Sequence, residues 1–216
     1  MPPPAIAGRL FIISAPSGVG KSTIIRKVIA ACPNLQFSVS CTTRPIRSGE
    51  VAGKDYHFLS VEEFQRGIRS GYFLEWAEVH GHLYGTDRRI IEKWLKAGEN
   101  VLLDIDVQGA RLVRCDYPAA KTIFILPPSM HVLEKRLRDR ATETAEQFAI
   151  RLAAARREIL ESPWFDFIIT NDDLEEAVED LKAILRASRS NRTSRAPGLK
   201  TFLMELSHEK DPFPRT

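Results

Sequence analysis

Short apolar runs alternate with amphipathic stretches along most of this chain. Four runs have the length and the nearly continuous hydrophobicity of parallel strands that are buried on both faces: residues 10–13, 101–106, 122–126 and 167–169. Residues 37–40 predict a further strand. Apolar residues recur at helical spacing between these strands and predict helices over residues 22–31, 86–98, 129–138, 144–161 and 174–189. Strands that alternate with helices predict an α/β fold with a doubly wound, five-stranded parallel core sheet.

A different pattern separates the second and third core strands. Residues 42–55 are polar, which is typical of an ordered binding loop or a surface connector. Ser60 and Glu63 form a capping box at the start of a short helix. Residues 73–79 alternate as in a strand, and residues 80–82 predict the turn that follows it.

The composition is that of a globular protein with 216 residues, of which 44% are hydrophobic and 27% are charged. A chain of this length buries about 70% of its unfolded surface on folding, so it needs no disulfide or structural metal. The formal net charge of +3 is too small to indicate a nucleic-acid partner, although it suits a protein that binds phosphates.

The cysteines and the apolar segments bear on location. Cys32, Cys41 and Cys115 are scattered, which argues against a disulfide framework or a zinc site and favours a reducing compartment. The first residues lack the basic and apolar regions of a signal peptide, and the apolar runs are too short to span a membrane. We expect a cytoplasmic protein with neither a membrane nor a nucleic-acid partner.

The strongest chemical signal follows the first predicted strand, where the chain reads Ala15-Pro16-Ser17-Gly18-Val19-Gly20-Lys21-Ser22. This is a phosphate-binding P-loop with alanine in place of the first glycine. Its glycines allow successive N–H groups to face a phosphate, and the helix that follows adds its N-terminal partial charge. We expect Lys21 to reach the β- and γ-phosphates of ATP, and the Ser22 hydroxyl to ligate Mg²⁺.

Two carboxylates, Asp104 and Asp106, end the third predicted core strand. An acid at this position of a P-loop protein holds Mg²⁺ directly or through water, and we assign that role to Asp104. The alternative is a pair of solvated carboxylates at a strand end, which a P-loop in the same chain makes less favourable.

Further segments resemble the guanylate kinase family of P-loop nucleoside monophosphate kinases. Residues 38–50 (SVSCTTRPIRSGE) and 53–56 (GKDY) resemble the signature segment of that family. The similarity extends, in the same order, to residues 73–78, 84–86, 103–109 and 170–173. It covers about residues 8–189, which is most of the chain.

The resemblance implies phosphorylation of GMP, and by extension dGMP, to GDP with ATP and Mg²⁺. It implies that the GMP phosphate is held by Arg44, Arg47, Tyr56 and Tyr84, and that guanine is read by Ser40, Glu75, Thr86 and Asp106. It also implies a catalytic set of positive charges made up of Lys21, Arg44, Arg140 and Arg151, with Arg136 as a weaker candidate.

The resemblance also divides the chain into three parts and a tail. It implies a core of residues 8–39, 99–126 and 165–189, a GMP-binding lobe of residues 40–98 and a helical lid of residues 127–164. Residues 190–216 are left as a basic, weakly ordered tail. The sequence departs from many relatives at Asp139-Arg140-Ala141, where they have Gly-Arg-Gly, and this predicts a stiffer lid hinge.

Elementary chemistry favours the same roles. Two anionic phosphates must approach each other, so catalysis needs positive charge and positioning rather than a strong base. Arginines such as Arg44 and Arg47 suit bidentate phosphate contacts. An ionised Glu75 accepts from both the N1–H and the amine of guanine, whereas adenine presents a lone pair at N1.

Several other interpretations are less favourable. His80 and His82 are expected to be loop residues rather than metal ligands, and the arginine row from residue 186 to 195 an exposed helix face rather than an RNA site. A non-catalytic guanylate-kinase-like interaction module is disfavoured by the intact P-loop. A P-loop kinase for another small phosphate ester is disfavoured by Glu75, Ser40 and Thr86. The sequence leaves the oligomeric state open, a homo-oligomer included.

Overall fold

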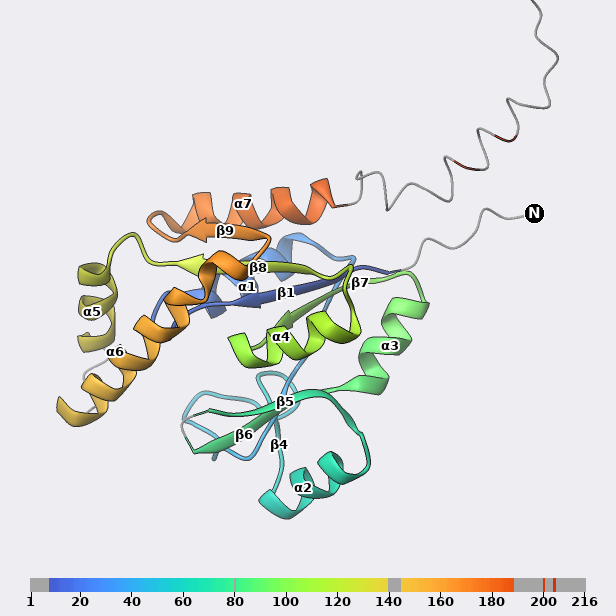
Figure 1. Cartoon of the computed structure of the whole chain (residues 1–216), viewed down its shortest axis with the longest axis horizontal. Coiled ribbons are helices and arrows are strands. Elements are labelled where there is room, and N and C mark those ends of the chain that lie inside the picture. Colours follow the sequence, from blue (N-terminus) through green and yellow to red (C-terminus); the bar gives the residue numbers. More distant parts are fainter. Residues whose placement is uncertain (1–7, 80, 140–144, 189–199, 201–203, 205–216) are drawn as a thin grey trace, which may run out of the picture.

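The computed structural model describes residues 8–79, 81–139, 145–188, 200 and 204. At its centre is a five-stranded sheet in the order β2-β7-β1-β8-β9 (Figure 1). Every neighbouring pair in it is parallel, as the sequence predicts. The strands are β1 (Leu10–Ser14), β2 (Leu35–Phe37), β7 (Asn100–Asp104), β8 (Lys121–Leu126) and β9 (Phe167–Thr170).

Helices cover both faces of this sheet, which is why its strands are apolar almost throughout. In β1, Phe11 and Ile13 pack into one apolar cluster with α1 (Lys21–Ala31) and α7 (Leu174–Ala187). Leu10 and Ile12 point to the opposite face and pack with α3 (Arg88–Lys96) and α4 (Val107–Asp116). Successive side chains of a strand alternate between faces, so a strand between two helical layers must be apolar at every position.

A second sheet lies beside the first and is drawn below it in Figure 1. Its order is β4-β3-β6-β5, and its strands are β3 (Cys41–Thr42), β4 (His57–Phe58), β5 (Phe73–Val79) and β6 (His82–Asp87). Helix α2 (Val61–Arg69) covers it, with Phe64 stacked on Phe73 at a centroid distance of 4.2 Å. The predicted capping box of Ser60 and Glu63 is present at the start of α2.

Two further helices lie beyond the carboxyl ends of the parallel strands (Figure 1). These are α5 (Met130–Arg138) and α6 (Ala145–Leu160), and a short 3₁₀ helix, η1 (Ser162–Trp164), leads back into β9. They share a small apolar cluster of their own, built on Leu133, Leu137 and Ala155. None of the helices within the described ranges is long and apolar enough to cross a membrane.

The structure corrects several sequence-based predictions. His82 lies in strand β6 rather than in the predicted turn, and β6 itself was not predicted. The predicted strand at 37–40 is wrong, because β2 ends at Phe37. Ser38 N still donates a hydrogen bond to Leu102 O of β7, and the chain then enters the second sheet at β3. The predicted strand at 101–106 ends at Asp104, and the following helix α4 was not predicted. Residue 80, the cap at Thr144 and the predicted tail, apart from residues 200 and 204, lie outside the described residues.

Candidate active site

The loop between β1 and α1 has the backbone of a phosphate-binding loop. Gly18 and Gly20 have φ values of 90° and 98°, a left-handed conformation that favours glycine. A Cβ on Gly18 would lie 2.8 Å from Leu137 Cδ2, and one on Gly20 would lie 2.7 Å from Asn171 Nδ2. Gly20 begins α1 without a side-chain cap from the described residues, so the first amides of the helix remain available to an anion.

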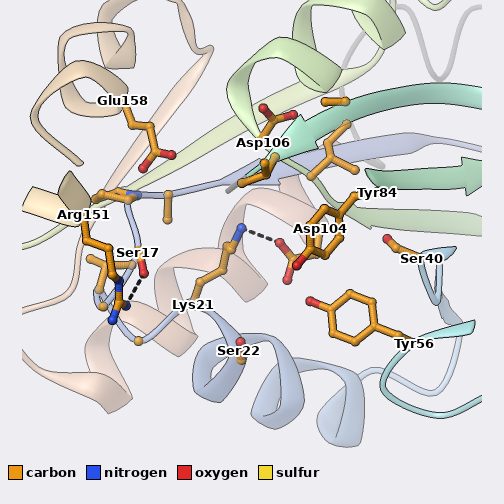
Figure 2. Close-up of a pocket in the computed structure, with 18 of the residues that line it drawn as sticks. Ser17, Lys21, Ser22, Ser40, Tyr56, Tyr84, Asp104, Asp106, Arg151 and Glu158 are labelled. Atoms are coloured by element: carbon orange, nitrogen blue, oxygen red, sulfur yellow. Dashed lines mark hydrogen bonds and ion pairs between the residues drawn. The ribbon is translucent and has the colours of Figure 1, made fainter. Parts of the chain in front are cut away.

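Lys21 and Asp104 face each other at the carboxyl edge of the parallel sheet. Asp104 ends β7 and pairs in register with Ile13 of the neighbouring strand β1, directly before the loop. Lys21 Nζ forms an ion pair with Asp104 Oδ1, drawn as a dashed line in Figure 2, and both side chains are about one-fifth exposed. A triphosphate in the loop would compete with Asp104 for Lys21 and leave the Asp104 carboxylate available to a cation.

The residues around Lys21 fit Mg²⁺ only as part of a nucleotide complex. Among the described residues, no group of three or more His, Cys, Asp or Glu could hold a metal ion. Ser22 at the start of α1 and Asp104 at the end of β7 both offer oxygen, the donor that Mg²⁺ prefers. Mg²⁺ is commonly bound by one or two protein oxygens, and phosphate oxygens and waters complete its coordination shell.

Glu75 of β5 lies at the other end of the site and is only 5% exposed. Thr86 Oγ1 donates a hydrogen bond of 2.6 Å to Glu75 Oε1. Burial raises the pKa of Glu75 to about 7, with the hydrogen bond from Thr86 opposing the shift and the charge of Asp106 adding to it. Gly109 of α4 packs so closely that a Cβ there would lie 2.6 Å from Glu75 Oε2.

Asp106 has a structural role that its sequence context did not predict. It is the N-cap of α4, and its Oδ1 accepts a hydrogen bond of 2.9 Å from Gly109 N. Its side chain also lines the same cavity as Glu75. One carboxylate therefore holds the start of α4 and faces the site (Figure 2).

A cluster of positive and aromatic side chains lies on the loop between β3 and β4. Arg44 is buried and donates two hydrogen bonds to Glu50, of 3.1 and 2.8 Å, and a third of 2.7 Å to Pro45 O. Glu50 also accepts a hydrogen bond of 2.8 Å from Arg47 N, so Glu50 holds the loop at both arginines. The Arg47 side chain itself is exposed. The Tyr56 ring lies 5.3 Å from the Arg44 guanidinium and meets Tyr84 edge to face.

Side chains from α5 and α6 reach the P-loop. Arg151 of α6 donates a hydrogen bond of 2.7 Å to Ser17 Oγ (Figure 2). Arg136 of α5 donates to Val19 O and to Asn171 O, both at 3.2 Å. The buried Asn171 donates to the same Val19 O at 2.6 Å. Arg140 lies outside the described residues.

Most of these groups share one cavity of about 1200 Å³. The predicted residues that line it are residues 15–22 together with Ser40, Arg47, Tyr56, Glu75, Tyr84, Asp104, Asp106 and Arg151. Arg44 and Thr86 are not in its lining, since both are buried behind it, where Arg44 binds Glu50 and Thr86 binds Glu75.

Three residues near the cavity were missed by sequence reasoning. Glu50 and Asn171 lie in segments that carry the family resemblance, but no role was assigned to them. Glu158 of α6 lines the cavity, and its Oε2 is buried without a hydrogen-bond partner in the described structure. Burial raises the pKa of Glu158. An acid within a basic helix gives no local signal that it will line this cavity.

Comparison with known proteins identifies this arrangement. The family model described as guanylate kinase matches residues 7–188. The chain is 48% identical over 198 residues to the guanylate kinase of Symbiobacterium thermophilum, covering 92% of this chain and 94% of that protein. It is 45% identical over 199 residues to the guanylate kinase of Thermotoga maritima, covering 92% and 96% respectively.

A solved structure agrees with the sequence relatives. The crystal structure of guanylate kinase from Anaplasma phagocytophilum superposes with a TM-score of 0.80 at 36% identity, covering 95% of this chain and 98% of that one. The shared fold, the two-ended cavity and the similarity over nearly the whole length lead to one conclusion: this chain belongs to the guanylate kinase family.

Proposed function

We propose that this protein transfers the γ-phosphoryl group of ATP to GMP and produces GDP and ADP. The observation that carries the proposal is the cavity itself, which has a P-loop at one end and the buried carboxylate of Glu75 at the other. A cavity of about 1200 Å³ has room for two nucleotides whose phosphates meet between these ends.

At the acceptor end, the base is recognised by Glu75 in its ionised form. Its two oxygens accept from N1–H and the exocyclic amine of guanine, and the hydrogen bond from Thr86 orients the carboxylate. Ser40 and Asp106 line the same region and supply further polar contacts. The same set accepts dGMP, since these contacts involve the base and not the sugar.

The GMP phosphate lies between this pocket and the P-loop. Arg47, Tyr56 and Tyr84 line the cavity there and bind it, while Arg44, locked against Glu50, supplies a fixed positive charge behind them. A phosphate oxygen of GMP attacks the γ-phosphorus as the bond to the ADP oxygen breaks. The phosphate is already largely dianionic at neutral pH, so no protein base is needed.

At the donor end, residues 15–22 wrap the ATP phosphates. Lys21 turns from Asp104 to the β- and γ-phosphates, and Arg151 turns from Ser17 Oγ to the transferring group. Arg140, which lies outside the described residues, is included in the catalytic set because of the family resemblance alone. Mg²⁺, held by Ser22 and Asp104, neutralises charge on the phosphates when it is bound.

We also propose the division of labour within the chain and its location. Residues 8–39, 99–126 and 165–189 form the core, residues 40–98 the GMP-binding lobe and residues 127–164 the lid. A cytoplasmic location is supported by the cysteines Cys32, Cys41 and Cys115, all of which are free thiols.

The deciding experiment measures ADP release with GMP, AMP, CMP and UMP offered separately. We expect turnover with GMP and at least ~100-fold lower kcat/KM with AMP. Lys21→Ala should reduce turnover by at least ~100-fold. Lys27→Ala is the matched control. Lys27 lies on the same helix but outside the cavity, and its Nζ forms an ion pair of 2.5 Å with Glu175. Absence of turnover with all four nucleotides would support the non-catalytic interaction module instead, whereas turnover that survives Lys21→Ala would remove Lys21 from the catalytic set.

A further inference from the structure

Helix α4 connects the guanine end of the site to the place where the chain leaves the proposed lid. Its first turn carries Asp106 and Gly109, which pack against Glu75. Its last two turns carry Arg111 and Arg114, three residues apart and therefore on the same face. Both arginines contact the segment of residues 161–166, which joins α6 to β9.

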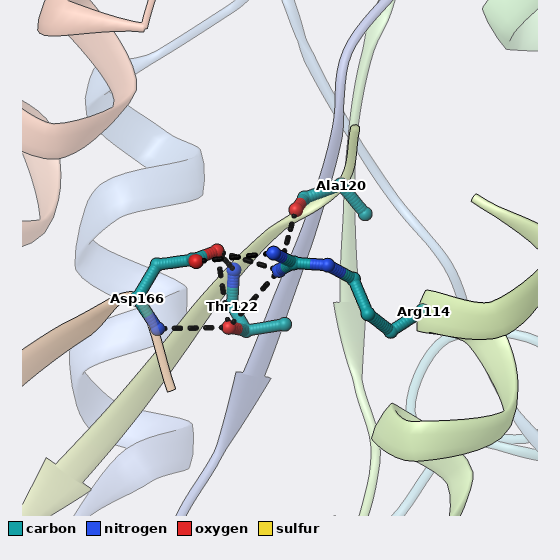
Figure 3. A network of polar contacts seen from close by, with 4 residues as sticks. All are labelled: Arg114, Ala120, Thr122 and Asp166. Carbon is teal, nitrogen blue, oxygen red and sulfur yellow. Dashed lines mark hydrogen bonds and ion pairs between the residues drawn. The ribbon is translucent and has the colours of Figure 1, made fainter. Parts of the chain in front are cut away.

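Arg114 and Asp166 are the centre of a closed polar network (Figure 3). Arg114 donates to both oxygens of Asp166, at 2.7 and 3.2 Å, and to Ala120 O at 2.9 Å. Thr122, fully buried at the start of β8, donates to Asp166 from its backbone N at 2.9 Å and from its hydroxyl at 3.1 Å. The same hydroxyl accepts from Asp166 N at 2.9 Å.

Arg111 holds the preceding residues of the same segment. It forms an ion pair with Glu161, and its guanidinium lies 5.1 Å from the centre of the Trp164 ring. Phe165 is buried against Phe124 of β8 at 4.9 Å. Residues 161–166 are therefore held on one side by α4 and on the other by β8, directly after α6 ends.

The orientation of α6 depends on this joint. The other lid helix, α5, is already tied to the P-loop by Arg136. Helix α6 carries Arg151 nine residues before its end at Leu160, or roughly 14 Å along the helix, and Asp166 follows six residues later. Over such a lever, a rotation of about 5° displaces Arg151 by more than about 1 Å, and a misplacement of 1 Å costs up to about 100-fold in rate.

We propose that Arg114 and Asp166 are positioning residues for phosphoryl transfer: together they form the fixed pivot that sets the direction of α6, and with it the reach of Arg151. The proposal rests on the GMP kinase activity proposed above. The pivot lies at the edge of the sheet opposite the phosphates, so neither residue touches a nucleotide.

The test compares Arg114→Met with Arg114→Lys and with Val113→Ala. Arg114→Met removes the forked contact but leaves Asp166 bonded to Thr122. Val113 is fully buried on the same helix, in the apolar cluster that also contains Phe165, but it makes none of the polar contacts of the network, so Val113→Ala controls for lost apolar packing alone. Rates are measured at a temperature at which all variants are folded, as judged by thermal unfolding.

For Arg114→Met we expect kcat to fall about tenfold, with KM for GMP within about twofold of the parent value. Arg114→Lys should recover part of kcat, because it restores the charge without the fork. An unchanged kcat, or an equal loss in Val113→Ala, would overturn the proposal and leave the network a purely structural one.

Hydrogen exchange supplies a readout that does not depend on turnover. In the nucleotide-free protein, amides of η1 and the last turns of α6 should exchange about tenfold faster in Arg114→Met and not in Val113→Ala. Combining Arg114→Met with Asp166→Asn should add little to either single variant, because the two residues act as one unit. Additive effects, or unchanged exchange, would contradict the pivot even if the kinase assay succeeds. If instead no GMP phosphorylation is found but the exchange differs as expected, the proposed function fails and the pivot stands.

Discussion

Thr86 Oγ1 lies 2.6 Å from Glu75 Oε1, and both side chains are buried where β5 and β6 run side by side. The hydroxyl stabilises the charged form of the carboxylate, whereas burial and Asp106 stabilise the neutral form. The balance places the pKa of Glu75 at about 7 in the free protein. The group proposed to recognise guanine thus titrates at neutral pH.

The first prediction concerns the pH dependence of GMP binding. Only the ionised carboxylate accepts two hydrogen bonds, so KM for GMP should rise as the pH falls below about 7, approaching about tenfold per unit. GMP binding should release a proton, measurable as buffer-dependent heat in calorimetry. Glu75→Gln should remove this part of the pH dependence and leave only the titration of the GMP phosphate. A KM that is flat in the parent protein would contradict the assignment.

The same shift has a consequence for stability in the absence of nucleotide. The pKa of Glu75 in the folded protein, about 7, lies above the ordinary value of 4.5 for a glutamate, so the folded state binds more protons than the unfolded state between these values. Its contribution therefore favours folding less and less as the pH rises from about 4.5 to about 7. The difference in thermal stability between the parent protein and Glu75→Gln should change across this window and stay constant at higher pH.

The second prediction is base specificity. Adenine would present a lone pair to Glu75, and a buried polar group left repelled costs about 1–3 kcal/mol, or more when charged. Glu75→Gln should lower kcat/KM for GMP and narrow the gap between GMP and AMP. Glu78→Gln is the matched control, because Glu78 lies on the same strand with an exposed side chain. An unchanged GMP/AMP ratio in Glu75→Gln would shift the recognition of guanine to Ser40, Thr86 and Asp106.

The third prediction uses the close approach of α4 to Glu75. In Gly109→Ala the new Cβ would lie 2.6 Å from Glu75 Oε2 and 3.1 Å from Asp106 Oδ1, so the carboxylate must move. We expect KM for GMP to rise at least ~10-fold while KM for ATP changes by less than about twofold. Leu112→Ala, a substitution at an exposed position of the same helix, should change neither constant. Equal losses for both nucleotides in Gly109→Ala would indicate general unfolding of α4.

The fourth prediction concerns the metal. Asp104→Asn removes the charge that pairs with Lys21 in the nucleotide-free protein and that is proposed to hold Mg²⁺. The Mg²⁺ concentration that gives the half-maximal rate should rise about tenfold, and KM for GMP should stay nearly constant. Asp116→Asn is a control on an exposed ion pair with Arg88, remote from the P-loop. A rise in KM for GMP alone would contradict the assignment of Asp104.

Several features of this protein can be predicted from its sequence, because each depends on residues that are close together in the chain. The P-loop is recognisable since its glycines, Lys21 and Ser22 must follow one another to wrap a phosphate, and the structure gives Gly18 and Gly20 the required positive φ. Four of the five core strands, all except β2, were predictable because burial on both faces requires apolar residues at every position. The capping box at Ser60 follows from a spacing of three residues.

The tertiary structure decided whatever depends on residues far apart in the chain. Asn171 reaches Val19 across 152 positions and Arg114 reaches Asp166 across 52, and no local pattern indicates that an asparagine or an arginine will have such a partner. The end of β2 at Phe37 depends on which strand still offers a partner, not on the apolar run itself. The neutral-range pKa of Glu75 likewise exists only because folding places β6 and α4 over a carboxylate and removes it from water. The sequence by itself determined the phosphate-binding loop, the strand-helix alternation and the residue types of the site, whereas packing decided which charges meet, which are buried and which helix joins the two ends of the cavity.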